Sequence, residues 1–390
     1  MSVQTGLEQL VSEHFALLAG KRPGLMTNPS AVDRTFQSTY DLFRIAPAIN
    51  LQALFGPEHG FAAAAPDATQ IANATDPKTG LPVYSLYGKV YRPTPEMLEN
   101  IDVLVCDIQD LGVRFYTYVW TVSYVLEACG EAGVEVMILD RPNPLGDRVA
   151  GPALAPDYAS FVGRFDIPIQ HGMSLGEMAQ MINGEWNPTP AKLTVVPCVG
   201  WQRELQWEET GLPFVTTSPA IPDLTTVLHY PGSCLIEGTT LSEGRGTALP
   251  FQVIGAPYID GAALAEQLNM LDFPGVRFRP HAFLPTDSKH AGTTCYGVQA
   301  HITDRESYRP IETWLGVLNT IRHAYPDDFG WLGIGQEYYE RGKLLHFDRL
   351  IGSDQPRLLI EQGADLKEIT ADWAQNSETF RQRREPYLLY

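Results

Sequence analysis

Short apolar runs that alternate with amphipathic stretches are the feature that most limits how this chain can fold. Residues 23–27, 51–55, 102–107 and 134–140 are typical of strands, and the run 102–107 is apolar enough for a strand buried on both faces. Helical spacing is found over residues 7–19 and 117–133. This repeated order of strand and helix predicts an α/β fold, a Rossmann-like parallel sheet with helices on both faces.

The length of the chain predicts more than one core, because 390 residues exceed what a single core normally supports. From about residue 251 onward the pattern favours mixed α and β structure. There we expect helices at 262–268 and 311–325 and strands at 275–279 and 297–302. We therefore expect a Rossmann-like domain over residues 1–250 and a smaller mixed α/β domain over residues 251–390.

Charge and cysteine content limit the partners and the compartment. The formal net charge is -18 and the Lys and Arg residues are scattered, which argues against a nucleic acid or an anionic membrane as partner. The five cysteines include no Cys-x-x-Cys pair, as is typical of buried thiols in a reducing compartment. The N-terminus has no basic start and no apolar run, so we expect a cytoplasmic protein, with the oligomeric state left open.

Polar side chains follow each of the four predicted strands. Glu58 and His59 stand in the loop that follows the second strand, and Asn28, Asp107 and Asp140 end the other three. Because the carboxyl ends of parallel strands meet at one edge of a sheet, these side chains are expected to share a crevice. A single loop Glu is more often solvated than functional, but four polar strand ends in succession favour a site.

A nucleotide cofactor is not expected in this sheet. The G-x-G-x-x-G fingerprint is absent after the first strand, where Pro29 blocks the tight phosphate turn, and no G-x-x-x-x-G-K-[ST] motif occurs. The glycine-rich run 243–247 has neither spacing. The sequence therefore predicts no cofactor.

A second polar group lies at residues 237–247, which hold Glu237, Glu243 and Arg245 among glycines. Two interpretations stay open: a flexible surface loop, or a segment whose backbone approaches a ligand. His171, at the end of a predicted short strand over 167–171, is equally compatible with a structural and a functional role. Ser174 and Glu177 have the spacing of a capping box and predict a helix start.

Long motifs in this chain resemble the NamZ-type exo-β-N-acetylmuramidases. They include LFGPEHG, DVLVCDIQDLGVRFYTY, ILDRPNPLG, HGMSLGE and YPGSCLIEGTTLSEGRGT, and the resemblance runs from about residue 20 to residue 390. It implies a glycosidase with its active-site cleft between a Rossmann-like domain and a smaller one. Such an enzyme releases terminal N-acetylmuramic acid from peptidoglycan fragments, in cell-wall recycling or degradation. The substrate would be a muramic-acid-containing saccharide or muropeptide.

The same resemblance assigns roles to residues. Glu58 matches the family's Gly-Pro-Glu-His-Gly motif and is the implied general acid, with His59 beside it. One departure follows, because the family's charged, glycine-containing loop is replaced here by Ala62–Ala65 and then Pro66 and Asp67. The residues that we expect to bind substrate are Asn28, Arg114, Tyr116, Asp140, Asn143, His171, Arg245 and His290, with Arg245 or Arg114 as the partner of the lactyl carboxylate.

Glycoside hydrolysis needs an acid and, on the other face of the sugar, either a second carboxylate or the acetamido group of the substrate. Glu237, Glu243 and Asp107 compete for the second role, and a retaining, an inverting and an acetamido-assisted mechanism all stay open. Two alternatives also stay open. One is a metal-dependent hydrolase that uses His59, Asp107 and His171. The other is a protein that binds cell-wall sugars without cleaving them.

Overall fold

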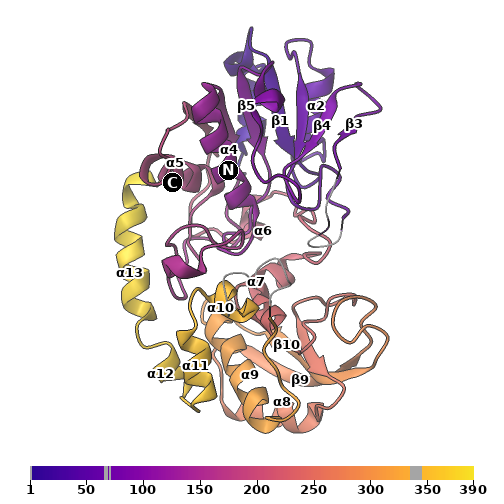
Figure 1. Cartoon of the computed structure of the whole chain (residues 1–390), viewed down its shortest axis with the longest axis vertical. Helices are drawn as coiled ribbons and strands as arrows, with labels where there is room; N and C mark the ends of the chain where they lie inside the picture. The colour runs from indigo at the N-terminus through magenta and orange to yellow at the C-terminus, as the bar shows by residue number, and fades with distance from the viewer. Residues whose placement is uncertain (1, 66–68, 70–71, 334–344) are drawn as a thin grey trace. The chain divides into compact units, whose positions relative to one another are not determined.

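The computed structural model describes residues 2–65, 69, 72–333 and 345–390, and these form two compact units (Figure 1). The first unit comprises Met1–Arg148, His171–Asp223 and Arg381–Tyr390, and the second comprises Val149–Gln170 and Leu224–Phe380. Residues 224–250, which the sequence analysis placed with the first domain, group with the second unit.

The first unit is built on a mostly parallel sheet. Among the described residues seven strands take part, in the order β3-β4-β2-β1-β5-β6-β7, and β3 alone among them runs antiparallel to its neighbour. The strands are β1 Pro23–Thr27, β2 Ala53–Gly56, β3 Ala74–Thr75, β4 Pro82–Ser85, β5 Val103–Asp107, β6 Glu135–Leu139 and β7 Leu193–Val196. The order reverses between β1 and β5, which creates a switch point at their carboxyl ends.

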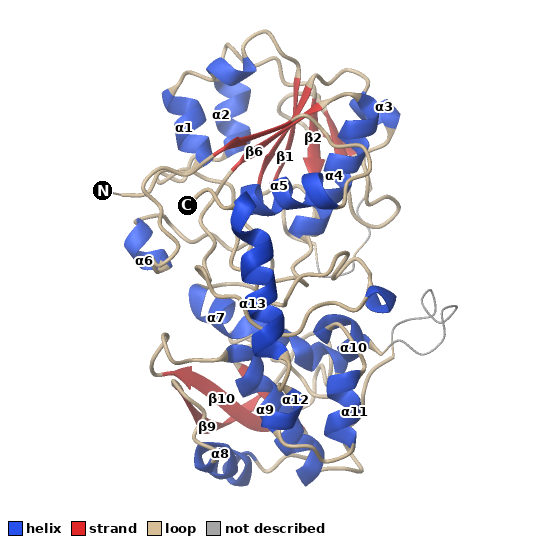
Figure 2. Cartoon of the chain, turned by 90° about the vertical axis from the view of Figure 1, so that its left-hand side faces the viewer, coloured by secondary structure: helices blue, strands red, loops and turns tan. Residues whose placement is uncertain are grey.

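Helices cover both faces of this sheet, as predicted (Figure 2). One face carries α1 Gly6–Ser12 and α2 Thr39–Ile45, and the other carries α3 Pro95–Leu98, α4 Tyr118–Ala132 and α5 Leu175–Glu185. The short helix α6, Trp207–Thr210, follows β7 along the chain. Strands β1, β2, β5 and β6 are buried along their whole length, which explains why their sequences are apolar rather than alternating. The predicted capping box of α5 is confirmed, because Ser174 and Glu177 cap each other.

Three local predictions for the first unit and its border differ from the structure. The helix expected over 7–19 ends at Ser12, because His14 and Phe15 adopt positive φ angles, and a 3-10 turn η1 follows at Ala16–Leu18. The strand expected over 167–171 is reduced to an isolated bridge between Ala150 and Gln170. Strand β4 was not predicted, since it is half-exposed and begins with a proline.

The second unit contains an antiparallel sheet, with three strands in its described part in the order β8-β10-β9. The strands and helices predicted at 262–268, 275–279, 297–302 and 311–325 are confirmed. The strands are β8 Val253–Ala256, β9 Val276–Phe283 and β10 Cys295–Ile302. The helices are α7 Leu224–Ser233, α8 Gly261–Met270, α9 Pro310–Ala324, α10 His346–Ile351, α11 Gln355–Glu361, α12 Leu366–Ile369 and α13 Trp373–Arg384, with 3-10 turns η2 Pro156–Tyr158, η3 Cys234–Gly238 and η5 Glu385–Tyr387.

The last residues of the chain dock on the first unit. The Tyr390 hydroxyl donates to Asp140 Oδ2 at 2.8 Å and accepts from the amide of Cys198 at 2.7 Å. The amide of Leu389 donates to Glu177 Oε1 at 2.7 Å. The C-terminus is therefore part of the folded unit rather than a free tail.

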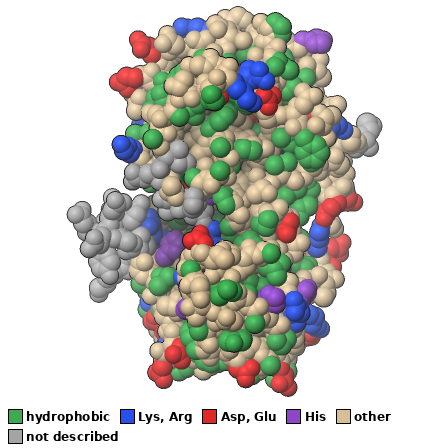
Figure 3. Space-filling view, turned by 90° about the vertical axis from the view of Figure 1, so that its right-hand side faces the viewer, with side chains coloured by type: hydrophobic (Ala, Val, Ile, Leu, Met, Phe, Trp, Pro, Cys, Tyr) green, Lys and Arg blue, Asp and Glu red, His purple; other side chains and the backbone are tan. Residues whose placement is uncertain are grey.

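The surface and the thiols agree with the composition. On the face drawn in Figure 3, the Lys and Arg side chains are scattered among acidic and neutral ones rather than gathered in a patch. All five cysteines lie within the described residues, where they are buried and form no disulfide. In the described part of the chain, no helix has the length and apolar character needed to cross a bilayer.

Candidate active site

A sharp turn presents Glu58 at the carboxyl end of β2. The amide of Gly60 donates to the carbonyl of Pro57 at 2.9 Å, and His59 and Gly60 have φ angles of 67° and 79°. The chain then folds back over Gly56 so closely that a Cβ atom there would lie 2.4 Å from the amide nitrogen of Phe61. This strained turn leaves the Glu58 side chain half-buried at the edge of the sheet.

Glu58 is hydrogen-bonded to the residue before α4, the helix that follows β5 along the chain. Its Oε2 accepts a hydrogen bond of 2.6 Å from the hydroxyl of Thr117. The next residue, Tyr118, accepts from Asn28 Nδ2 at 2.9 Å and donates to the carbonyl of Thr217 at 2.6 Å. Loops after β1 and β2 and the first turn of α4 thus meet in one polar network, which brings Asn28 and Glu58 together as the sequence predicted.

His59 supports the loop in which this chain departs from the family pattern. Its Nδ1 lies 2.9 Å from the carbonyl of Ala65, so Nδ1 carries the proton and donates. The amide of Ala65 returns a bond of 3.3 Å to the carbonyl of His59. The run Ala62–Ala65 is therefore fixed to the Glu58 turn, while Pro66 and Asp67 lie outside the described residues.

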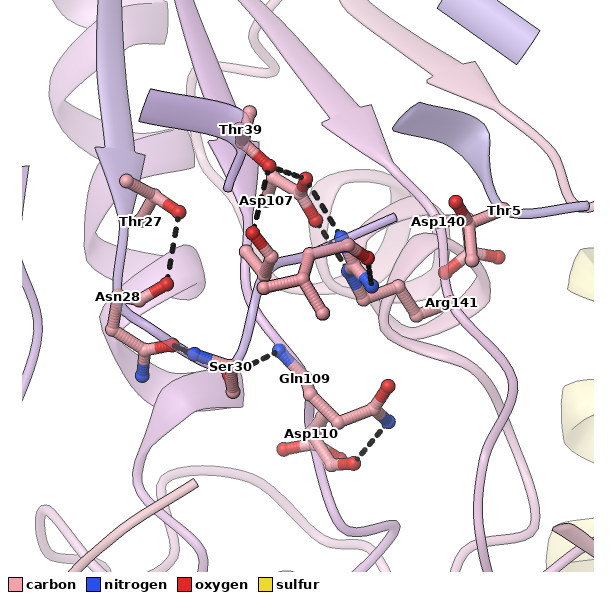
Figure 4. A network of polar contacts seen from close by, with 12 residues as sticks. Thr5, Thr27, Asn28, Ser30, Thr39, Asp107, Gln109, Asp110, Asp140 and Arg141 are labelled. Carbon is pink, nitrogen blue, oxygen red and sulfur yellow. Dashed lines mark hydrogen bonds and ion pairs between the residues drawn. The ribbon is translucent and has the colours of Figure 1, made fainter. Parts of the chain in front are cut away.

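Asp107, a predicted catalytic candidate, is fully buried in an ion pair (Figure 4). Its Oδ1 accepts from Arg141 Nε at 2.5 Å, and its Oδ2 accepts from the second nitrogen of that guanidinium at 3.0 Å. The hydroxyl of Thr39 also donates to Oδ2. Arg141 gives a further bond of 2.9 Å to the carbonyl of Val32. The geometry therefore favours a structural role for Asp107, which ties β5 to the loop after β6.

Asp140 and Asn143, two predicted substrate ligands, are also engaged by the protein. Asp140 accepts from Ser174 Oγ at 2.6 Å and from the amide of Gly176 at 2.8 Å, besides Tyr390. Burial raises the pKa of Asp140 to about 6. Asn143 donates to the carbonyl of Met173 at 3.2 Å and accepts from the amide of Leu145 at 2.9 Å. Both side chains connect loops at the sheet edge.

Asp110 and His171 form a second buried pair at this edge. His171 Nδ1 accepts from the amide of Met173 at 3.2 Å, so the proton is on Nε2, which lies 3.9 Å from Asp110 Oδ2. Neither Nε2 nor Asp110 Oδ1 has a hydrogen-bond partner in the described part of the chain. Burial raises the pKa of Asp110 to about 7, although the amide of Gly112 donates to its carboxylate and acts in the opposite direction. Burial and the positive charge of Arg384 lower the pKa of His171 to about 3.

This pair predicts a measurable dependence of stability on pH. Because the folded pKa of Asp110 is raised, its contribution to stability is present at low pH and is lost as the pH rises through about 7. Asp110→Asn removes that contribution but leaves Asp140 in place. The difference between the melting temperature of Asp110→Asn and that of the unchanged protein is therefore expected to increase, in favour of the variant, from about pH 5 to about pH 8. Equal pH dependence in the two proteins would mean that Asp110 is ionised in the fold.

Arg114 and Tyr116, two further predicted substrate ligands, are buried as well. Arg114 is 0% exposed and Tyr116 is 5% exposed, and the Tyr116 ring lies 4.7 Å from the Tyr118 ring, edge to face. Burial raises the pKa of Tyr116 above its ordinary value. With its guanidinium enclosed, Arg114 is placed inside the fold rather than on an open surface.

In the second unit, the charged side chains of residues 237–247 form an ion-pair cluster. Arg245 contacts Glu237 Oε1 through two of its nitrogens and lies 3.2 Å from Glu243 Oε1. Lys289 Nζ lies 2.8 Å from Glu243 Oε2, and His346 lies 3.7 Å from Glu237 Oε2. Burial opposes ionisation of Glu237, but Arg245 and His346 outweigh it and hold its pKa below the ordinary value. Glu237 is thus an anion, which does not suit a general acid.

The flexible-loop interpretation of residues 237–247 is wrong. Thr239, Ser242 and Glu243 are each at most 2% exposed, and Arg245 lies over the ring of Phe251 at 4.9 Å. His290 Nε2 lies 2.8 Å from the carbonyl of Thr240, so it braces the same segment. Gly246 allows the backbone of residues 286 and 287 to approach this segment closely, since a Cβ at position 246 would lie 2.4 Å from the amide nitrogen of Asp287.

The metal interpretation gains no geometric support. Within the described residues, no three His, Cys, Asp or Glu side chains are grouped as ligands. His59 donates to Ala65, Asp107 pairs with Arg141, and His171 faces Asp110. The three side chains on which that interpretation depends are therefore committed to different partners.

Several residues of these networks carry no functional signal of their own in the sequence. Thr117 and Tyr118 stand at a helix start, where they read as ordinary cap and core residues, and Lys289 lies far along the chain from Glu243. Asp110 falls within the quoted motif but beyond the strand end at Asp107. The useful signal was the run Tyr116-Thr117-Tyr118, whose hydroxyls gather where a helix begins beside the sheet edge.

These observations define an α/β protein whose polar site is assembled from loops at the carboxyl edge of a parallel sheet. Residues 24–225 match the description "Exo-beta-N-acetylmuramidase NamZ, N-terminal", and residues 228–390 match "Exo-beta-N-acetylmuramidase NamZ, C-terminal". The chain belongs to this family, which confirms the resemblance seen in its motifs.

Individual relatives agree with this membership. The chain is similar to the peptidoglycan beta-N-acetylmuramidase NamZ of Bacillus subtilis, with 46% identity over 389 residues that cover 100% of this chain and 91% of that protein. Crystal structures of two DUF1343 family proteins from Bacteroides fragilis also match. One has a TM-score of 0.90 and 39% identity, and the other a TM-score of 0.77 and 33% identity. Each match covers 100% of this chain and 99% of the other.

Proposed function

We propose that this chain is an exo-acting glycosidase that releases terminal N-acetylmuramic acid from peptidoglycan-derived fragments, with Glu58 as its general acid. The activity is supported by family membership over both halves of the chain and by the Bacillus subtilis relative, whose name describes it as a peptidoglycan beta-N-acetylmuramidase. One observation carries the role of Glu58. It is half-buried at a strand end with a single hydrogen-bond donor, Thr117, among the described residues.

The chemistry fits this position. A protonated Glu58 would donate to the glycosidic oxygen as the bond to the anomeric carbon breaks. The second role does not require a protein carboxylate, because the acetamido oxygen of the substrate can act as the nucleophile. Among the carboxylates predicted for that role, Asp107 is paired with Arg141 and Glu237 with Arg245. The predicted substrate ligands stay predictions.

Release of chromophore from two matched glycosides tests the activity. The protein is expected to cleave a chromogenic N-acetylmuramide at least about tenfold faster than the corresponding N-acetylglucosaminide, a barrier difference of about 1.4 kcal/mol. The two sugars differ by the lactyl ether alone. Binding of the muramide without release would favour the non-catalytic interpretation.

A chelator added to the same assay separates the metal-dependent alternative. The proposal expects unchanged turnover, since its proton transfer uses a carboxyl group and no metal ion. Loss of turnover that returns with added Zn²⁺ would support a metal-dependent hydrolase instead. We place the activity in cytoplasmic recycling of cell-wall sugars as part of the same proposal, supported by the five buried and unpaired thiols.

A further inference from the structure

The residue before helix α4 uses its side chain in an unusual way. Serine or threonine at this N-cap position normally accepts from a backbone amide of the first turn, which contributes about 1 kcal/mol of stability. Thr5, Ser38 and Ser174 do this for α1, α2 and α5. Thr117 does not, although α4 has 15 residues. Its backbone is already helical, with φ -72° and ψ -9°, so the hydroxyl points elsewhere.

The hydroxyl of Thr117 is directed at Glu58. It donates to Oε2 at 2.6 Å across 59 positions of sequence, which is a short distance typical of a bond to a carboxylate. Thr117 is 8% exposed, so water competes little for this contact. A bond that replaces a stabilising cap and joins the helix to the proposed acid points to a role in function rather than in folding.

The start of α4 is fixed by hydrogen bonds, which fix the position of the Thr117 hydroxyl as well. Tyr118, the first helical residue, bonds to Asn28 at the end of β1 and to the carbonyl of Thr217. The Asn28 side chain is fixed in turn by Ser30, whose amide donates to Asn28 Oδ1 at 3.0 Å. Thr117 is therefore attached to a first turn that is anchored to the central strand of the sheet.

We propose that Thr117 is a positioning residue for the acid and thereby selects which carboxyl oxygen delivers the proton. This inference rests on the proposed function. Thr117 occupies Oε2, so the transferable proton is on Oε1. In the bond-breaking step that proton moves to the glycosidic oxygen, which takes the electron pair of the broken carbon–oxygen bond. Glu58 is left as a carboxylate that still accepts from Thr117, and a proton from the attacking water later returns to Oε1.

Three variants test the role of the hydroxyl. Thr117→Val removes it at nearly constant volume, and Thr117→Ser keeps it. Thr121→Val is the matched control, because the Thr121 hydroxyl lies one turn along the same helix and donates at 3.3 Å to the carbonyl of Thr117, not to Glu58. Release of a muramide is measured for each as kcat, KM and a pH profile, with thermal unfolding in parallel.

Thr117→Val is expected to lower kcat by about 10- to 100-fold with little change in KM. Its alkaline limb is expected to move to higher pH, because the carboxylate loses a donor. Thr117→Ser and Thr121→Val are expected to stay within about threefold of the unchanged protein, since both keep the hydroxyl that contacts Glu58. If Thr117→Val does not fold, Thr117→Ala takes its place.

Three outcomes overturn the inference, and they are distinguishable from one another. If Thr117→Val matches Thr121→Val in kcat and pH profile while Glu58→Gln is inactive, Thr117 does not position the acid and the proposed function stands. If Glu58→Gln keeps its activity on a muramic acid–sugar linkage, Glu58 is not the general acid, and the inference fails together with that part of the proposed function. A fall in kcat without a shift of the alkaline limb would assign Thr117 a structural role only.

Discussion

Replacing Glu58 with Gln is expected to lower kcat for release of a terminal N-acetylmuramic acid by about 10²- to 10⁴-fold, the usual contribution of a general acid. Gln has nearly the same shape and its side-chain oxygen still accepts from Thr117, so the turn at the end of β2 is expected to remain intact. What Gln cannot do is transfer a proton. The measurement is steady-state release of the sugar, with thermal unfolding of the same samples.

The matched control for this prediction is Glu99→Gln. Glu99 is exposed at the end of α3, so the same chemical change there is expected to leave both kcat and melting temperature nearly unchanged. Turnover of a muramic acid–sugar linkage by Glu58→Gln within about tenfold of the unchanged protein would exclude Glu58 as the acid, since that is about 1.4 kcal/mol of barrier.

Removing the charge of Asp107 is expected to destabilise the protein by about 3–5 kcal/mol, because Asp107→Asn leaves the buried guanidinium of Arg141 without its counter-ion. Asp107 is fully buried and Arg141 nearly so. Replacing both with apolar residues, as in Asp107→Leu with Arg141→Met, removes the unpaired charge and is expected to cost less than the single change. Denaturant unfolding measures the free energy of unfolding of the unchanged protein, of Asp107→Asn and of the double variant.

An exposed pair of the same chemistry serves as the control. Arg22 and Asp102 lie 2.8 Å apart, with side chains 44% and 40% exposed, just before β1 and β5. Asp102→Asn is expected to destabilise the protein much less than Asp107→Asn, because water screens that exposed pair. If Asp107→Asn cost no more than Asp102→Asn, the Asp107 contacts would not hold the sheet edge together, and its role in the site would need to be reconsidered.

The sheet was predictable because its buried strands have a simple sequence pattern, a continuous run of apolar residues. Runs such as 23–27 and 102–107 are apolar throughout, since helices cover both faces and no position faces water. Half-exposed β4 has no such pattern, and η1 interrupts a helical pattern through the backbone angles of His14 and Phe15. Those angles depend on packing that periodicity does not record.

The site was predictable only as far as the strand ends. Polar residues after the strands do meet at one edge, but the sequence does not say whether such a side chain faces a ligand or another loop. Asp107 pairs with Arg141, which lies 34 positions away in the sequence, and Glu58 accepts a hydrogen bond from Thr117, which lies 59 positions away. Both partners are set by the order of strands, which places the loops after β5 and β6 together and brings the start of α4 to the loop after β2.

The role of Glu58 as the general acid is tested most directly by how the turnover of Glu58→Gln depends on the leaving group of the substrate. A good leaving group such as dinitrophenolate departs without protonation, whereas a sugar hydroxyl needs the acid. Glu58→Gln is expected to cleave a dinitrophenyl N-acetylmuramide within about tenfold of the unchanged protein, but to lose about 10³-fold or more on a muramic acid–sugar linkage. An equal loss on both substrates would contradict the assignment of Glu58 as the general acid.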